Sequence, residues 1–168
     1  LFQKYPESQE DPLFGATLTD LGIIYARRGQ FDRAEPLLVR GLETREKTLG
    51  ADHPDVRRSL VSLKTMYGQW NRWAEAETFA RRALPLVERD NGPDAPQTRD
   101  IVLELAYACL LQGKVADGRS FMTRFVAIAK AAKYPELSND VRQLAEILRT
   151  LGLNAEAAEL ERSLLNTL

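Results

Sequence analysis

The chain has 168 residues, of which 44% are hydrophobic and 28% are charged, so it is long enough to bury a core of its own. A net charge of -1 lacks the basic excess that nucleic-acid binding requires, and no apolar run approaches the roughly 20 residues that span a bilayer. A single cysteine excludes an internal disulfide and a cysteine zinc site. We therefore expect a cytoplasmic protein whose partners are neither nucleic acid nor membrane and which needs no cofactor.

An internal repeat begins at Pro12. A shift of 42 residues places Pro12 on Pro54 and Pro96, and a shift of 39 places Pro96 on Pro135. Such periodicity is typical of repeat proteins, in which each unit is one supersecondary structure. We predict one domain over residues 12–168 and assign residues 1–11 to the tail of a preceding repeat or to a linker. The repeats are expected near 12–53, 54–95, 96–134 and 135–168.

The apolar residues of each repeat fall into two blocks with helical spacing. In the first repeat, Leu18, Leu21 and Tyr25 mark one face of a helix, and a second block starts at Phe31 after a break at Gly29. Each repeat is therefore predicted to be a helical hairpin. The first helices are expected near 12–28, 54–70, 96–112 and 135–151, and the second helices near 31–49, 73–90, 115–132 and 154–167.

Proline and glycine mark the ends of the predicted first helices. Each helix is expected to begin with a proline, whose missing N–H costs nothing at the first helical position. Each is expected to end before a residue with a left-handed backbone, which glycine and asparagine favour. The prolines are Pro12, Pro54, Pro96 and Pro135, and the cap residues are Gly29, Asn71, Gly113 and Gly152.

Two further sets of residues predict how the helices pack. Small residues recur where the helices of a hairpin approach most closely, and leucines recur where neighbouring hairpins meet, since a hairpin buries its apolar face only against the next one. The small residues are Ala34, Ala76, Gly118 and Ala157, and the leucines are Leu21, Leu63, Leu105 and Leu144.

Residues 17–56, TLTDLGIIYARRGQFDRAEPLLVRGLETREKTLGADHPDV, resemble a tetratricopeptide repeat (TPR). The 42-residue period, the AEPL segment and the LGADHPDV connector are similar to repeats of the kinesin-light-chain type. The resemblance implies an all-α fold, a right-handed superhelical α-solenoid of four stacked hairpins. It also implies a concave groove, lined by first helices, that binds peptides or proteins. The third repeat departs from the pattern, because Gly118-Arg119 replaces the Ala-Glu pair of the first two repeats.

The family pattern projects one face of each first helix onto the groove. Kinesin-light-chain-like repeats usually carry paired asparagines on this face, whereas this chain has Thr19-Asp20 in the first repeat and Leu103-Glu104 in the third. A partner would therefore meet a mixture of charged, polar and apolar side chains. The candidate partner-binding residues are Asp20, Ile23, Arg27, Arg58, Ser62, Thr65, Gln69, Glu104, Tyr107, Leu111, Arg142 and Arg149, and Thr19 falls on the same projected face.

We assign no catalytic residue and no metal ligand. The single histidine, His53, lies at a predicted helix start, where a structural role is favoured over a metal or general-base role. Cys109 falls on the core position that Tyr25 and Tyr67 occupy, so a packed thiol is favoured over a reactive one. For Trp70, packing over the hairpin turn is favoured over contact with a partner.

We predict a non-catalytic scaffold that binds a partner peptide or protein segment in the groove. One alternative is self-association into a homo-oligomer through the N-terminal end. Another is that the repeats form the sensor or targeting portion of a larger signalling or catalytic protein, which the opening Leu1 and the partial upstream repeat favour.

Overall fold

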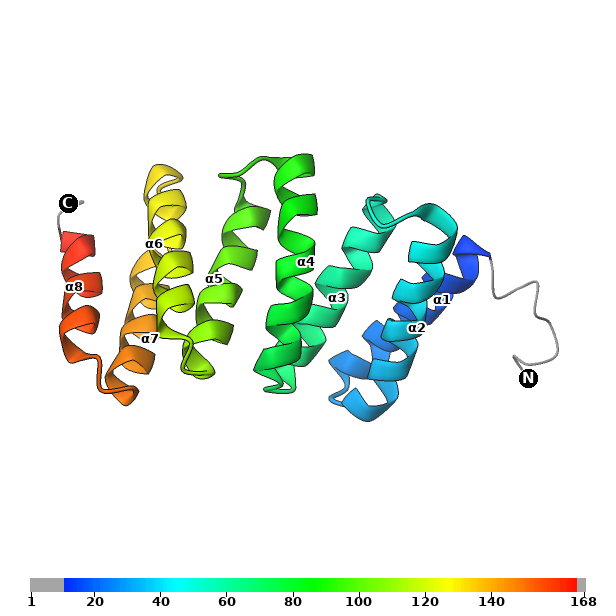
Figure 1. Cartoon of the computed structure of the whole chain (residues 1–168), viewed down its shortest axis with the longest axis horizontal. Coiled ribbons are helices and arrows are strands. Elements are labelled where there is room, and N and C mark those ends of the chain that lie inside the picture. The colour runs from blue at the N-terminus through cyan, green and yellow to red at the C-terminus, as the bar shows by residue number, and fades with distance from the viewer. Residues whose placement is uncertain (1–10, 166–168) are drawn as a thin grey trace. The chain divides into compact units, whose positions relative to one another are not determined.

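The computed structural model describes residues 11–165, and these residues form eight α-helices joined by short turns (Figure 1). They divide into two compact units between Leu86 and Val87, inside α4, and each unit is described by itself. The helices are α1 Pro12–Arg27, α2 Phe31–Leu49, α3 Pro54–Gln69, α4 Trp73–Asn91, α5 Pro96–Leu111, α6 Val115–Ala131, α7 Leu137–Thr150 and α8 Asn154–Leu165.

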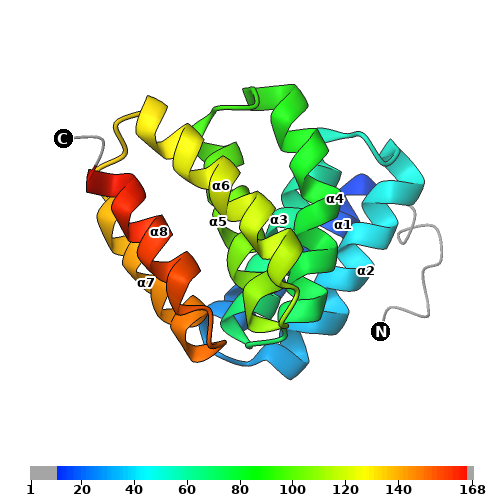
Figure 2. The ribbon, with the colours of Figure 1, turned by 60° about the vertical axis from the view of Figure 1, so that its left-hand side comes forward.

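The predicted helical hairpins are confirmed. α1 packs against α2, α5 against α6, and α7 against α8, and Figure 2 shows the last two pairs side by side. Predicted and observed helix ends differ by two residues or fewer wherever both are described. The end predicted for the last helix, residue 167, lies outside the described residues.

Polar side chains cap the first helices of the first unit. The Asp11 carboxylate accepts a hydrogen bond from the backbone N–H of Leu13 at 2.8 Å, at the start of α1. Nδ1 of His53 accepts one from the backbone N–H of Asp55 at 3.1 Å, at the start of α3. Each cap satisfies a backbone donor that has no partner within its helix.

The proline prediction is confirmed at three helix starts and wrong at the fourth. Pro135 lies in a turn, and α7 begins two residues later at Leu137. The turn is closed by a hydrogen bond of 3.3 Å from the backbone N–H of Leu137 to the carbonyl of Tyr134, so the chain bends once before it becomes helical. The prolines at a first helical position are Pro12, Pro54 and Pro96.

The hairpin turns share one backbone design. The second residue past the helix cap donates its N–H to a carbonyl five residues earlier, as Gln30 does to Tyr25 at 3.0 Å. The residue before this donor has a positive φ, which is 71° at Gly29 and 58° at Asn71. The predicted caps are therefore confirmed, including those at Gly113 and Gly152.

α1 and α2 approach closely because glycines line their crossing. A Cβ on Gly41 of α2 would lie 3.0 Å from the carbonyl oxygen of Gly15 and 2.6 Å from the hydroxyl of Thr19, both on α1. Thr19 is fully buried, and its hydroxyl donates to the Gly15 carbonyl at 2.8 Å. The projection of Thr19 onto the groove is therefore wrong, because this side chain lies in the α1–α2 interface.

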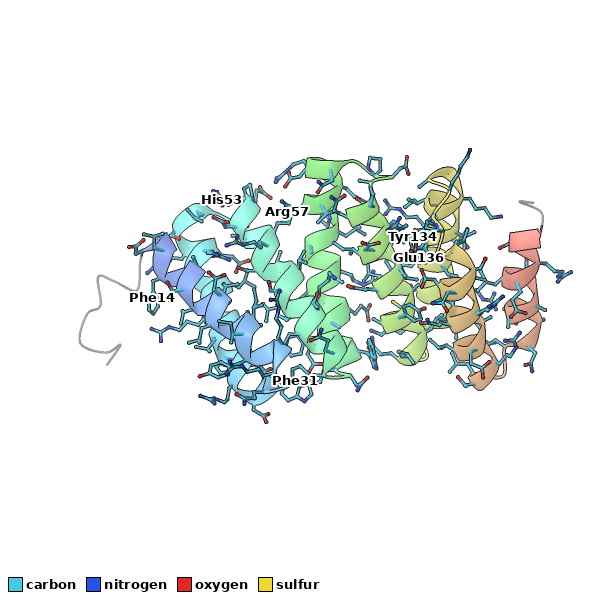
Figure 3. All side chains as sticks on the ribbon, turned by 180° about the vertical axis from the view of Figure 1, so that it is seen from behind. Phe14, Phe31, His53, Arg57, Tyr134 and Glu136 are labelled. Carbon is cyan, nitrogen blue, oxygen red and sulfur yellow. The ribbon has the colours of Figure 1, made fainter. Side chains whose placement is uncertain are left out.

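Stacked aromatic rings connect the hairpins of the first unit. Tyr67 of α3 stacks on Phe79 of α4 with a centroid distance of 5.5 Å and on Trp70 at 6.4 Å. Trp70 in turn stacks on Phe31, at 5.6 Å. Figure 3 shows Phe31 at the end of these helices opposite to His53. Trp70 is half-buried and packs over the hairpin turn, as predicted from the sequence.

Glu35 of α2 adds a polar link to this stack. Its carboxylate accepts hydrogen bonds from the Tyr67 hydroxyl at 2.7 Å and from Arg72 at 2.9 Å. The pKa of the Tyr67 hydroxyl is raised, mainly because the group is buried and secondly because it donates this hydrogen bond. The Arg72 guanidinium also lies 4.8 Å from the ring centre of Trp70. The two hairpins of the first unit are therefore joined by both rings and charges.

The small residues at the hairpin crossings are buried, as predicted. Ala34 and Ala157 have no exposed surface, and Ala76 is 6% exposed. At Gly118, the Leu110 side chain fills the space that a Cβ would take, approaching it to 2.6 Å. The third hairpin has glycine where the others have alanine, because the Leu110 side chain packs against this position.

The leucine prediction is confirmed at three positions and wrong at one. Leu63, Leu105 and Leu144 have no exposed surface, whereas Leu21 is 40% exposed. Leu21 shares the uncovered side of α1 with Ile24, which is 47% exposed. Within their own units, Leu63 of α3 follows the α1–α2 hairpin and Leu144 of α7 follows the α5–α6 hairpin, and these hairpins contact α3 and α7. No described helix covers the exposed side of α1.

Candidate functional site

The first helices of the first unit form a cleft. α1 and α3 are in contact, and a cavity of about 220 Å³ opens between them. Five of the candidate residues from the sequence line it, together with four further side chains. The candidates are Ile23, Arg27, Ser62, Thr65 and Gln69, and the further residues are Ala26, Leu38, Val61 and Met66.

The cleft has an apolar floor and a polar rim. Leu38 and Met66 are each 1% exposed and form part of the floor. Arg27, Thr65 and Gln69 are exposed at the rim. Within residues 11–165, Arg27 has no hydrogen-bond or ion-pair partner, so its guanidinium is available to an acceptor on a ligand.

Arg45 of α2 is buried against α3, close to two further candidates. Its Nη1 donates to Ser59 Oγ at 2.6 Å and to the Asp55 carbonyl at 3.3 Å, while Nε and Nη2 have no hydrogen-bond partner among the described residues. Burial lowers the pKa of Arg45, and the charge of Arg58 acts in the same direction. Asp55 and Asp20 oppose this effect. The exposed candidates Asp20 and Arg58 therefore act on Arg45 electrostatically and do not line the cleft.

Arg45 was not among the residues predicted from the sequence, although the repeat register carries a signal for it. The shift of 42 aligns Arg45 with Val87 and Ala129, which are 1% and 0% exposed. An arginine at an apolar core position indicates a buried cation whose desolvation must be offset by hydrogen bonds.

In the second unit, Tyr107 links the two first helices. Its hydroxyl donates to Oε1 of Gln143 on α7 at 3.1 Å and lies 3.4 Å from the Asp140 carbonyl oxygen. Burial and, after it, the charge of Asp140 raise the pKa of the Tyr107 hydroxyl. This candidate therefore joins α5 to α7. The other candidates on these two helices are exposed to solvent, and they are Glu104, Leu111, Arg142 and Arg149.

Asp140 is a second polar residue that the sequence analysis missed. Burial raises the pKa of its carboxyl; a hydrogen bond from Tyr134 lowers this pKa, and the charge of Glu136 raises it again. The Asp140 Oδ2 atom is buried and has no hydrogen-bond partner among the described residues. Figure 3 shows Tyr134 and Glu136 next to each other, and the Arg99 guanidinium lies 3.8 Å from the Tyr134 ring centre. The repeat length changes from 42 to 39 residues between the third and fourth repeats. Alignment with the earlier repeats therefore did not point to Asp140 and its neighbours.

Arg149 is engaged within its own hairpin. Its Nη2 lies 2.7 Å from Oε2 of Glu161 on α8, and its Nη1 lies 3.5 Å from Oε2 of Glu146. The hydrogen bond to Glu161 is the largest cause of the raised pKa of Arg149. The charge of this candidate is therefore compensated inside the α7–α8 hairpin, unlike that of Arg27.

His53 and Cys109 occupy the cap and core positions that the sequence predicts. His53 is the cap of α3, and its Nδ1 lies 3.8 Å from a carboxylate oxygen of Asp55. Cys109 has no exposed surface and belongs to the core. In the part of the chain that the structure describes, none of the helices has both the length and the apolar character needed to cross a bilayer.

Comparisons with known proteins agree with this architecture. A tetratricopeptide-repeat family model matches residues 13–89. None of the curated proteins compared matches the chain. The TPR-like repeats of a protein described as a kinesin light chain from Podosopora anserina are 24% identical, with a TM-score of 0.71 over 89% of this chain and 72% of that one. BtubC (BKLC) from P. vanneervenii is 18% identical, with a TM-score of 0.77 over 94% of this chain and 64% of that one.

Residues 13–89 are tetratricopeptide repeats. The similar structures also cover most of the residues beyond 89, which confirms the all-α fold class for the later hairpins. The resemblance to repeats of the kinesin-light-chain type is confirmed at the level of fold. Domains built of tetratricopeptide repeats are generally scaffolds for interactions between proteins.

Proposed function

We propose that the chain binds a segment of a partner protein in the cleft between α1 and α3. The observation that carries this proposal is that five side chains expected from the repeat register line one cavity with an apolar floor. A preformed cleft lowers the ordering cost on the receptor side. Binding is an equilibrium without a catalytic step, and the cytoplasmic location expected from the sequence is part of this proposal.

The lining of the cleft favours a segment with an apolar side chain next to hydrogen-bonding groups. The apolar side chain would pack on Leu38 and Met66. The Ser62 hydroxyl donates to the Arg58 carbonyl at 3.0 Å, so its free lone pairs would accept from a ligand. Arg27 would donate to a carbonyl or carboxylate of the segment.

The test is selection of binders from a displayed random-peptide library, followed by affinity measurements with purified variants. We expect the selected peptides to lose about tenfold or more in affinity for Arg27→Glu, because the change repels their acceptors at the rim. Arg28→Glu is the matched control, since Arg28 is exposed and does not line the cleft. Thermal unfolding of both variants verifies that they are folded.

The methionines provide a direct reporter of where the peptides bind. The chain contains two, and Met66 lines the cleft between α1 and α3. With methyl-labelled methionine, a peptide in the cleft should shift the Met66 signal in NMR spectra. Peptides that bind Arg27→Glu and Arg28→Glu equally well, without moving the Met66 signal, would contradict the proposal.

Self-association is a second candidate function, supported by the uncovered side of α1. Leu13, Leu21 and Ile24 are 72%, 40% and 47% exposed, which is a cost in water unless another surface covers them. If a second copy covers them, light scattering should show a mass that rises with protein concentration. The Leu21→Lys/Ile24→Lys variant should then remain monomeric. A constant monomer mass for the wild type would exclude this candidate.

A further inference from the structure

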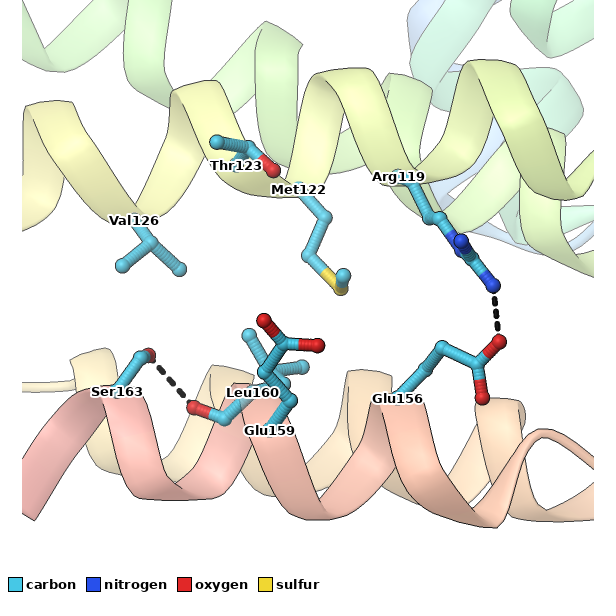
Figure 4. A pocket seen from close by; sticks show the side chains of 8 residues that line it. All are labelled: Arg119, Met122, Thr123, Val126, Glu156, Glu159, Leu160 and Ser163. Carbon is cyan, nitrogen blue, oxygen red and sulfur yellow. Dashed lines mark hydrogen bonds and ion pairs between the residues drawn. The ribbon is translucent and has the colours of Figure 1, made fainter.

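A second cavity lies in the second unit, between the second helices of its two complete hairpins. It opens between α6 and α8 and has a volume of about 410 Å³ (Figure 4). None of its lining residues belongs to the first-helix cleft of the first unit. The two cavities are therefore separate sites.

The floor of this cavity is apolar and adaptable. Met122 and Val126 of α6 and Leu160 of α8 line it, and they are 8%, 9% and 6% exposed. Their residual exposure leaves apolar surface that an incoming side chain can cover. Met122 adapts to different shapes, because its unbranched thioether chain has several rotatable bonds.

Among the side chains that line the cavity, negative charge exceeds positive charge, and the nearby Lys130 ammonium is bonded to the Ser163 carbonyl. Arg119 of α6 forms an ion pair with Glu156 of α8, which bridges the two helices (Figure 4). Glu159 also lines the cavity and is exposed, and it has no hydrogen-bond or ion-pair partner among residues 11–165. Figure 4 shows its carboxylate directed into the space between the helices. Two carboxylates thus face one guanidinium, which is already paired.

We propose that the α6–α8 cavity is a docking site for a partner segment that carries an aliphatic side chain next to a lysine or arginine. The aliphatic side chain packs on Met122, Val126 and Leu160, and the neighbouring cation pairs with Glu159. The charge at the rim is what selects this occupant, since Glu159 repels acidic segments and phosphates.

The test uses two capped probe peptides that differ only in charge. The basic probe is glycine-leucine-lysine-lysine-leucine-glycine, and the acidic probe has glutamates in place of the lysines. Binding is followed on the methionine methyl signals, because Met122 reports on this cavity and Met66 on the α1–α3 cleft. We expect the basic probe to shift the Met122 signal and the acidic probe to leave it unchanged.

A charge exchange at Glu159 makes the test specific. Glu159→Lys should weaken binding of the basic probe about tenfold and should allow the acidic probe to bind. The matched control is Glu43→Lys, which changes an exposed carboxylate on α2 and should alter the binding of neither probe. Equal binding of both probes to the wild type, no Met122 shift with the basic probe at millimolar concentration, or unchanged affinity in Glu159→Lys would overturn the proposal. If the Met122 signal shifts and the measured mass rises when the protein is concentrated without a probe, a second copy of the chain occupies the cavity, and this result would also overturn the proposal.

The outcome does not depend on the first-helix cleft. Arg27→Glu should leave the Met122 response to the basic probe unchanged, and Glu159→Lys should leave unchanged the binding of peptides that shift Met66. Either proposal can thus fail while the other stands.

Discussion

Gly41→Val is expected to lower the free energy of unfolding of the first unit by about 3 kcal/mol, the upper part of the range for overpacked positions. A Cβ at this position would lie 3.0 Å from the Gly15 carbonyl oxygen, which is backbone and cannot rotate away. It would also lie 2.6 Å from the Thr19 hydroxyl, whose hydrogen bond to Gly15 would be disturbed. The two further methyl groups of valine force α1 and α2 apart.

Urea denaturation followed by tryptophan fluorescence measures this effect, because Trp70 and Trp73 both lie in the first unit. Gly68→Ala is the matched control. A Cβ there meets only Trp73, at 3.8 Å, and alanine is favoured over glycine inside a helix by about 0.5–1 kcal/mol. The control should therefore be as stable as the wild type or more so. A Gly41→Val midpoint equal to that of the wild type would show that α1 and α2 do not approach this closely in solution.

The helices and their turns were predictable because their signals are local. A proline at the first helical position or a glycine after the helix end acts on its own turn, whatever packs around it. Pro135 is the exception. It lies inside a turn that is closed by the hydrogen bond from the Leu137 N–H to the Tyr134 carbonyl, a contact that the proline itself does not reveal.

The side-chain environments were less predictable because they depend on the neighbouring helix. Thr19 was projected onto the groove, but Gly41 opposite it leaves room for its side chain in the α1–α2 interface. The same reasoning applies to Arg45, whose buried position is compatible with charge only because Ser59 and the Asp55 carbonyl accept its hydrogen bonds. The partner that decides the environment of Thr19 is Gly41, which is distant in sequence and has no side chain. For Arg45 it is Ser59, which is also distant in sequence.

The candidate site was predictable in part for the same reason. Five candidates line the α1–α3 cleft, because the first two repeats keep a constant length and the projected faces coincide. In the later repeats the period shortens, and the polar contacts of Tyr107 and Asp140 arise from residues that the register does not align.

Leu144→Ala is expected to destabilise the second unit by about 2–5 kcal/mol, the range for truncating a fully buried leucine. Leu144 has no exposed surface, so the change removes apolar contacts and leaves a cavity in α7's packing surface. Unfolding followed by circular dichroism measures the loss, because the tryptophan signal reports on the first unit alone.

Leu21→Ala is the matched comparison, since the two leucines occupy the same position of the repeat. Leu21 is 40% exposed, and we expect a loss of no more than about 1 kcal/mol in dilute protein, because surface substitutions rarely exceed this size. The repeat position alone would predict equal effects for the two substitutions. The difference arises from burial: a leucine of the repeat contributes fully to stability only where a preceding hairpin covers it. Equal losses at the two positions would mean that α1 is covered in solution, and a loss for Leu21→Ala that grows with protein concentration would assign that cover to a second copy.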